Sequence, residues 1–270
     1  APAGLMRADP YLIHFRKAGL NLYYVSANHE SREDSKTFAV IRGAFKAFPL
    51  QRVIVEGRLN DEGDISAESA RRIIREAKGG SYKWGEGAFA IALAYKKGIR
   101  AIGGEPRESD VYQELRRAGF APEDMLGLGF VHMIPAYRNQ GRLGTDGTEV
   151  LFAETMKWKR AAFGIPTDIV FDYASFLRWH RVKTGEDFDP MKVSYETARP
   201  DPTGTFLQRM ADATTNIRNR FLAGVMTLEL RKHGQVLVVY GNGHHAAQRR
   251  ALVAAFGEPV YEGVFPGERR

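Results

Sequence analysis

Short apolar runs alternate with amphipathic stretches over the first 106 residues, and this alternation is the feature that most restricts the fold. The runs at 22–26, 52–57 and 99–106 have the length and composition of buried strands. Between the first two, residues 33–48 carry apolar side chains at three- to four-residue spacing, as an amphipathic helix does. Strands that alternate with helices form parallel sheets with right-handed crossovers. The sequence therefore predicts an α/β fold with a mostly parallel sheet flanked by helices.

The pattern then becomes almost entirely helical from about residue 122 to residue 231. A further strand at 235–240 and a helix at 246–256 follow it. We therefore predict one α/β domain over residues 1–270, with 122–231 as a helical insertion or cap between the third and fourth core strands.

The composition excludes several classes of protein. Hydrophobic residues make up 44% and charged residues 26%, which is ordinary for a globular protein with a substantial core. The net charge of +7 comes from basic residues mixed with acidic ones and no recognition motif accompanies it, so nucleic-acid binding is not favoured. The absence of cysteine excludes disulfides, zinc–thiolate sites and cysteine nucleophiles. No apolar run has the roughly 18 residues of a membrane span.

The compartment has only one sequence signal. The first residues, Ala1–Gly4, are typical of a mature end left by signal cleavage, which favours an exported, periplasmic protein over the alternative of a cytoplasmic one. The sequence does not specify an oligomeric state.

A histidine or a glutamate follows each of four predicted parallel strands. His29, Glu56, Glu105 and His244 come after the first to the fourth strand respectively. The carboxyl ends of parallel strands meet at one edge of a sheet, where α/β proteins bind ligands. We expect the four side chains to converge there, either as ligands of a divalent metal ion or as general base and acid on a bound water.

Structural explanations exist for the same residues. His29 can cap the helix that follows it, and Glu105 can cap the helix expected after Pro106. Glu56 can form an ion pair with Arg58 or Arg52. Both kinds of explanation fit the spacing.

Further residues near this edge are candidates for substrate contacts. Arg218, in the long helix predicted at 205–233, would stabilise negative charge on a substrate, although an exposed helical arginine is the alternative. Arg58, Asn242 and His245 adjoin the strand-end residues and are expected to bind substrate.

Four short motifs carry a resemblance to the superfamily of erythromycin esterase-like, ChaN-like and TraB/GumN/Tiki proteins. They are Ser26–His29, Val53–Glu56, Arg218–Phe221 and Gly241–His244, in the order of that group. Two departures are Ser26 in place of a glycine and Phe221 in place of an aliphatic residue.

The resemblance implies a His/Glu/His site at the sheet edge. Tiki-like members resemble metal-dependent proteases, erythromycin esterase-like members hydrolyse a lactone without a required metal, and ChaN-like members bind haem iron. The sequence thus predicts a hydrolase that acts on an ester or amide of a small molecule or peptide through activated water. The alternative is a non-enzymatic protein that binds haem or another small ligand.

Overall fold

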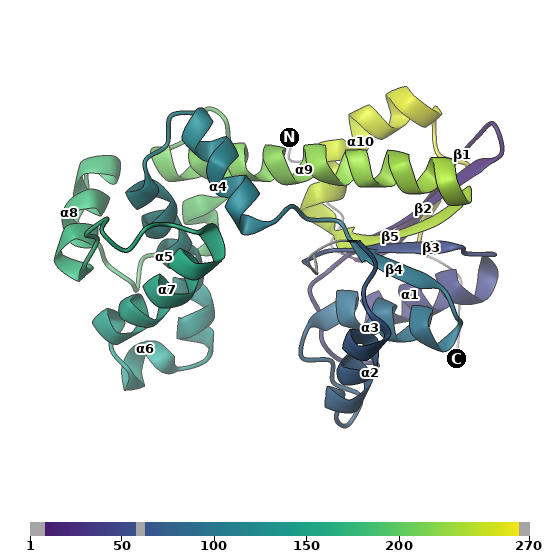
Figure 1. The fold of residues 1–270 in the computed structure, drawn as a ribbon, viewed down its shortest axis with the longest axis horizontal. Helices are drawn as coiled ribbons and strands as arrows, with labels where there is room; N and C mark the ends of the chain where they lie inside the picture. The colour runs from purple at the N-terminus through teal and green to yellow at the C-terminus, as the bar shows by residue number, and fades with distance from the viewer. Residues whose placement is uncertain (1–8, 58–62, 265–270) are drawn as a thin grey trace. The chain divides into compact units, whose positions relative to one another are not determined.

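A computed structural model describes residues 9–57 and 63–264 and divides the chain into two compact units. Unit 1 comprises Ala1–Glu105 and Asn219–Arg270, and unit 2 comprises Pro106–Arg218. The predicted α/β class is confirmed: unit 1 contains a mixed, mostly parallel sheet with helices on both faces (Figure 1).

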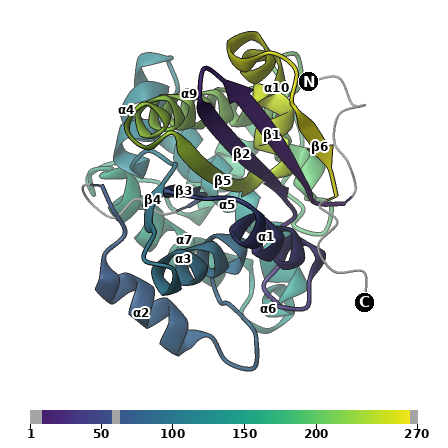
Figure 2. The same ribbon diagram turned by 90° about the vertical axis from the view of Figure 1, so that its right-hand side faces the viewer.

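The sheet of unit 1 has six strands in the spatial order β4-β3-β5-β2-β1-β6 (Figure 2). Strands β2, β3, β4 and β5 are mutually parallel, whereas β1 runs antiparallel to both of its neighbours. The strands are β1 (Tyr11–Lys17), β2 (Leu20–Ala27), β3 (Arg52–Val55), β4 (Arg100–Gly103), β5 (Gln235–Gly241) and β6 (Tyr261–Gly263).

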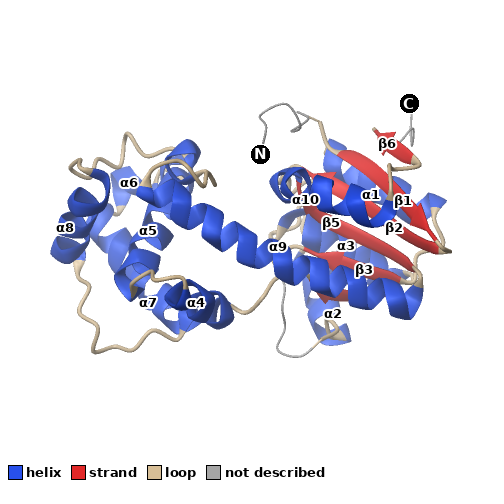
Figure 3. Ribbon diagram, turned by 90° about the horizontal axis from the view of Figure 1, so that it is seen from above, coloured by secondary structure: helices blue, strands red, loops and turns tan. Residues whose placement is uncertain are grey.

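Helices cover both faces of this sheet because the strands are buried on both sides. On one face, α1 (Lys36–Ala47), α2 (Ala67–Glu76) and α3 (Gly85–Lys96) form one apolar core with the sheet. On the other face, the last part of α9 (Phe206–His233) and α10 (Asn242–Phe256) form a second core with it. Figure 3 shows the strands between these helices.

The chain reverses its direction across the sheet between β2 and β5. The crossovers from β2 to β3 and from β3 to β4 proceed toward one edge, and those that enter and leave β5 proceed toward the other. Right-handed crossovers in opposite directions place their helices on opposite faces, which is the observed arrangement. The loops after β2 and β5 therefore diverge, and such a switch point is where open α/β sheets form a crevice.

Unit 2 is helical and has its own core of aromatic and aliphatic side chains around Phe130, Phe152 and Phe176. Its elements are α4 (Glu108–Arg117), α5 (Pro122–Asn139), α6 (Arg142–Thr145), α7 (Thr148–Phe163), α8 (Tyr173–Thr184), the 3-10 helix η1 (Tyr195–Ala198) and the first part of α9. None of the helices within the described ranges combines the length and apolar character needed to cross a bilayer.

The insertion lies at 106–218 rather than at the expected 122–231. It begins earlier because α4, the helix expected after Pro106, buries Val111, Tyr112 and Leu115 in the core of unit 2. It ends earlier because the last part of α9 buries Leu222 and Met226 against the sheet of unit 1.

Candidate functional site

The residues that follow the four parallel strands line the carboxyl edge of the sheet of unit 1. Ala27 pairs with Gly241 at the last position of the β2–β5 ladder, so His29 and His244 leave the sheet from adjacent strands. Glu56 follows β3, on the other side of β5, and its backbone N–H donates to the Val239 carbonyl.

Glu56 lies between the two histidines. One carboxylate oxygen, Oε1, is 3.6 Å from Nε2 of His244. The other, Oε2, accepts a hydrogen bond of 2.7 Å from the backbone N–H of Gly241. A carbon added at Gly241 would stand 3.0 Å from Oε2 of Glu56 and 3.4 Å from Nε2 of His29. Nε2 of His29 and Oε2 of Glu56 therefore border the space that a side chain at position 241 would occupy. Because residue 241 is glycine, this space stays open.

The ring of His29 is oriented by a carboxylate. Nδ1 of His29 is 2.7 Å from Oε1 of Glu86, which belongs to the first turn of α3. Because a carboxylate only accepts, Nδ1 carries the proton and donates it to Glu86, and in the neutral ring Nε2 keeps its lone pair. The Glu86 side chain is 7% exposed and that of His29 is 75% exposed, so the orienting group is buried while the ring meets solvent.

The ring of His244 is oriented by an amide. Nδ1 of His244 is 2.7 Å from Oδ1 of Asn219, at the point where α9 enters unit 1. The same oxygen accepts 3.1 Å from Nε2 of Gln248, which identifies this atom as the amide oxygen. Nδ1 of His244 is then the donor, and Nε2 is the ring atom that faces Glu56.

Two overlapping sets of side chains have the spacing of metal ligands. One nitrogen of His29 and one oxygen each of Glu56 and Glu86 lie within 4.8 Å of one another. The same holds for Glu56, Glu105 and His244. All four predicted metal ligands thus occur in these sets, together with Glu86, and Glu56 belongs to both. Imidazole and carboxylate donors without sulfur suit divalent zinc, manganese or iron.

A buried tyrosine adds to the polar character of the edge. The side chain of Tyr24 is fully buried, and its hydroxyl has no hydrogen-bond partner among the described residues. Burial raises the pKa of this phenol well above its ordinary value, and the negative charge of Glu56 raises it further. Tyr24 therefore remains neutral.

Two of the residues expected to bind substrate have contacts with other side chains of unit 1. The amide nitrogen of Asn242 donates 3.0 Å to Oδ1 of Asn28 and so ties together the turns after β5 and β2. His245 is 1% exposed, its Nδ1 is 2.9 Å from the Tyr11 hydroxyl, and its ring packs on Tyr24. The geometry favours a packing role for His245.

The remaining two candidates stay predictions. Arg58 lies outside the described residues. Arg218 is the last residue of unit 2, whereas the next residue, Asn219, holds His244 in unit 1.

Glu86 and Asn219 are the site residues that sequence reasoning missed. The apolar pattern predicts a helix at 87–97, which leaves Glu86 in the preceding loop, whereas in the structure α3 begins at Gly85. Asn219 lies within the Arg218–Phe221 motif, but only Arg218 of this motif is selected as a candidate from the sequence. No spacing rule identifies either residue, since both reach the site through helix packing.

The chain was also compared with known proteins. Neither a scan against models of protein families nor searches of curated proteins and of solved structures found a match. The arguments for function therefore rest on the site itself.

Proposed function

We propose that this protein is a hydrolase that activates a water molecule between His29, Glu56 and His244. The observation that carries the proposal is the orientation of the two rings. Each holds its Nδ1 proton on a dedicated partner, Glu86 or Asn219, and each presents Nε2 toward Glu56. Two oriented imidazoles that face one carboxylate can supply the proton acceptor and the proton donor that acid–base catalysis on water needs.

The partners of the two rings assign them different roles. Glu86 stabilises the positive charge that His29 gains when it takes a proton, as the carboxylate of a catalytic triad does. His29, which is also the more exposed ring, is therefore the general base that deprotonates the water. His244 has a neutral amide behind it and faces the Glu56 carboxylate with Nε2, so the ring protonated at Nε2 is the acid that gives this proton to the leaving group. The proton that His29 takes from the water leaves to solvent from its exposed ring, and His244 regains a proton from solvent before the next turnover.

The four predicted ligands fall into two sets, and each set also fits a divalent ion: Glu56 with Glu105 and His244, or Glu56 with His29 and Glu86. Such an ion, when bound, supplies Lewis acidity and lowers the pKa of a bound water. The two orienting hydrogen bonds are of the kind that fix metal-bound histidines, so they are equally required with and without an ion.

The test uses a panel of activated esters and short peptides with the full chain. We expect His29→Ala and His244→Ala each to reduce kcat/KM by about 10²–10⁴-fold, the usual contribution of a general acid or base. His233→Asn, at the far end of α9, serves as the control that keeps wild-type activity. Unchanged hydrolysis in both site variants would show that the two histidines do not form an active site.

Metal analysis and a visible spectrum of the same sample separate the remaining alternatives. A stoichiometric divalent ion that is lost in Glu56→Gln would support the metal-assisted form of the proposal. A Soret band, in a protein that hydrolyses nothing on the panel, would instead support the haem-binding alternative that the sequence resemblance implies.

A further inference from the structure

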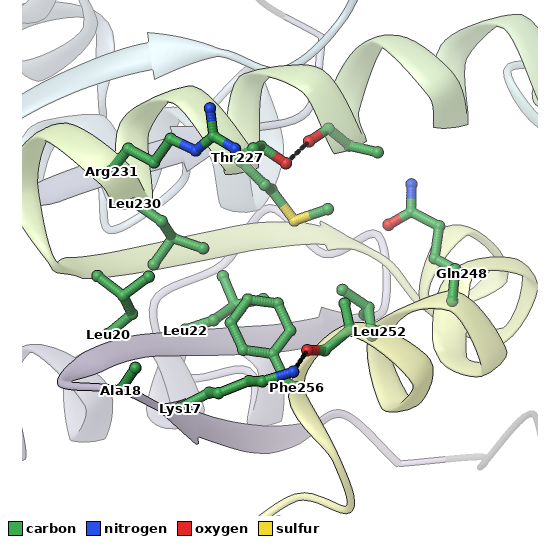
Figure 4. A pocket seen from close by; sticks show the side chains of 14 residues that line it. Lys17, Ala18, Leu20, Leu22, Thr227, Leu230, Arg231, Gln248, Leu252 and Phe256 are labelled. Carbon is green, nitrogen blue, oxygen red and sulfur yellow. Dashed lines mark hydrogen bonds between the residues drawn. The ribbon is translucent and has the colours of Figure 1, made fainter.

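A cavity of unit 1 lies on the face covered by α9 and α10, and none of the strand-end residues of the candidate site lines it. Its volume is about 530 Å³, which is within the range of small-molecule sites. The lining is mostly aliphatic and aromatic, with Leu20, Leu22, Met226, Leu230, Leu252 and Phe256 among its residues (Figure 4). Well-packed protein interiors do not contain voids of this size, so the space is suited to an apolar ligand.

Small side chains keep this cavity open to solvent. Ala223 of α9 and Ala251 and Ala255 of α10 line it and are exposed. Leu22 and Leu252 form a buried apolar surface beneath them. A flexible chain could therefore enter from the surface and lie along the buried leucines.

Two positive charges stand at one end of the cavity. Lys17, from the end of β1, and Arg231, from the last turn of α9, both line it and are exposed. Lys17 donates to the carbonyl of Ala255, and no acidic side chain pairs with either cation within the described residues. This end is therefore complementary to an anionic group.

A buried acceptor stands at the other end. Gln248 is 6% exposed, and its Oε1 has no hydrogen-bond partner within residues 9–57 and 63–264. Its Nε2 donates to the carbonyl oxygen and to Oδ1 of Asn219, which fixes the orientation of the amide. Figure 4 shows the Gln248 oxygen turned toward the cavity. A buried acceptor without a donor is costly, and a ligand hydroxyl would satisfy it.

We propose that this cavity binds an anionic amphiphile, with its carboxylate at the rim that carries Lys17 and Arg231 and its chain directed toward Gln248. Eight residues of α9 separate Ala223 from Arg231, which corresponds to about 12 Å of helix and to an extended chain of roughly ten carbons. The ligand class is therefore a medium-chain carboxylate, and one with a terminal hydroxyl fits best. This binding does not depend on the hydrolase proposal, because it is measured without turnover.

The first test is calorimetric titration of the full chain with decanoate and with decylamine, which has the same chain and the opposite charge. We expect decanoate to bind with a negative heat-capacity change, the mark of apolar burial, and decylamine to bind more weakly. The variant Ala251→Phe, at an exposed helical position, fills the cavity and should abolish binding. Equal binding of both probes, or unchanged binding to Ala251→Phe, would overturn the proposal.

Charge variants test the end of the cavity that carries Lys17 and Arg231. Lys17→Met and Arg231→Met together should weaken decanoate binding by roughly 25-fold, if each exposed cation contributes about fivefold. The control Arg75→Met with Lys96→Met removes the same charge from α2 and α3 and should leave the affinity unchanged. Equal losses in both double variants would show that only net charge matters and would contradict a defined site.

The terminal hydroxyl tests the inner end. We expect 10-hydroxydecanoate to bind about tenfold more tightly than decanoate, since its hydroxyl supplies the donor that Oε1 of Gln248 lacks. Gln248→Met should remove this advantage and retain decanoate binding. If the advantage persists in Gln248→Met, the chain does not reach this residue and the assigned direction is wrong.

Discussion

Gly104 offers the sharpest test of how tightly the site edge is packed. It follows β4 and immediately precedes Glu105, and its N–H donates 2.8 Å to the Val55 carbonyl. An added Cβ would lie 2.7 Å from a ring carbon of Tyr240 and 2.9 Å from methyl carbons of Ile54 and Leu222. Ordinary contacts begin at 3.4 Å, so each neighbour would have to move by about half an ångström or more.

None of the three neighbours can move freely, because all are fully buried between the sheet and α9. Overpacking of this kind costs about 1–3 kcal/mol, and three fixed contacts favour the middle of that range. We therefore expect Gly104→Ala to lower the free energy of unfolding by about 2 kcal/mol and Tm by roughly 4–8 °C. The displaced Tyr240 ring packs edge-on against His244, so the candidate site should be perturbed as well.

Gly224 is the matched control. It lies inside α9, and an added Cβ there meets nothing within 4 Å. Gly224→Ala should increase the free energy of unfolding by up to about 1 kcal/mol through helix propensity alone. Urea titrations followed by circular dichroism measure both changes as shifts of midpoint at constant m. No loss in Gly104→Ala, or a comparable loss in Gly224→Ala, would refute the reasoning.

Three other predictions concern stability. Ala18 adopts a positive φ in the two-residue turn between β1 and β2, so Ala18→Asn should raise the free energy of unfolding by about 0.5–1 kcal/mol. An unchanged urea midpoint would contradict this. Arg52 forms a buried ion pair with Glu229, so Arg52→Met should lower the free energy of unfolding by about 3–5 kcal/mol. Adding Glu229→Leu to this variant should restore much of the lost stability. Burial lowers the pKa of His14 and His180 in the folded chain. Their contribution to the free energy of unfolding is therefore present above pH 6.5 and is lost below it, as the unfolded chain takes up protons. The free energy of unfolding, measured by urea titration, should differ less between pH 7 and pH 5 when both histidines are replaced by Gln.

The convergence of the strand-end residues could be predicted from sequence. A strand followed by a polar residue is a local pattern, and the parallel order of strands brings such positions to one edge by rule. His29, Glu56, Glu105 and His244 all follow strands in this way, and they gather as expected. The prediction required no knowledge of which strand lies beside which.

The supporting residues could not be predicted, because they depend on helix packing. Glu86 reaches His29 only because of the rotation of α3 on the sheet, and Asn219 reaches His244 only because of that of α9. The start of α10 was also misplaced: the sequence at 242–245 is typical of a turn, with Asn and Gly as poor helix formers. In the structure the helix begins at Asn242, and the burial of His245 against Tyr11 and Tyr24 accompanies it.

The order of the strands determines when the site can form. β5, the fourth parallel strand along the chain, lies between β2 and β3, which do not pair with each other. The segment before unit 2 therefore cannot complete a sheet by itself, whereas unit 2 has a core made only of its own residues. Pairing of β5 closes a loop of more than a hundred residues, and this long-range step is entropically the most costly. The same step delivers His244 to Glu56 and Gly241 to the gap beside His29, so both histidines meet the carboxylate only in the completed sheet.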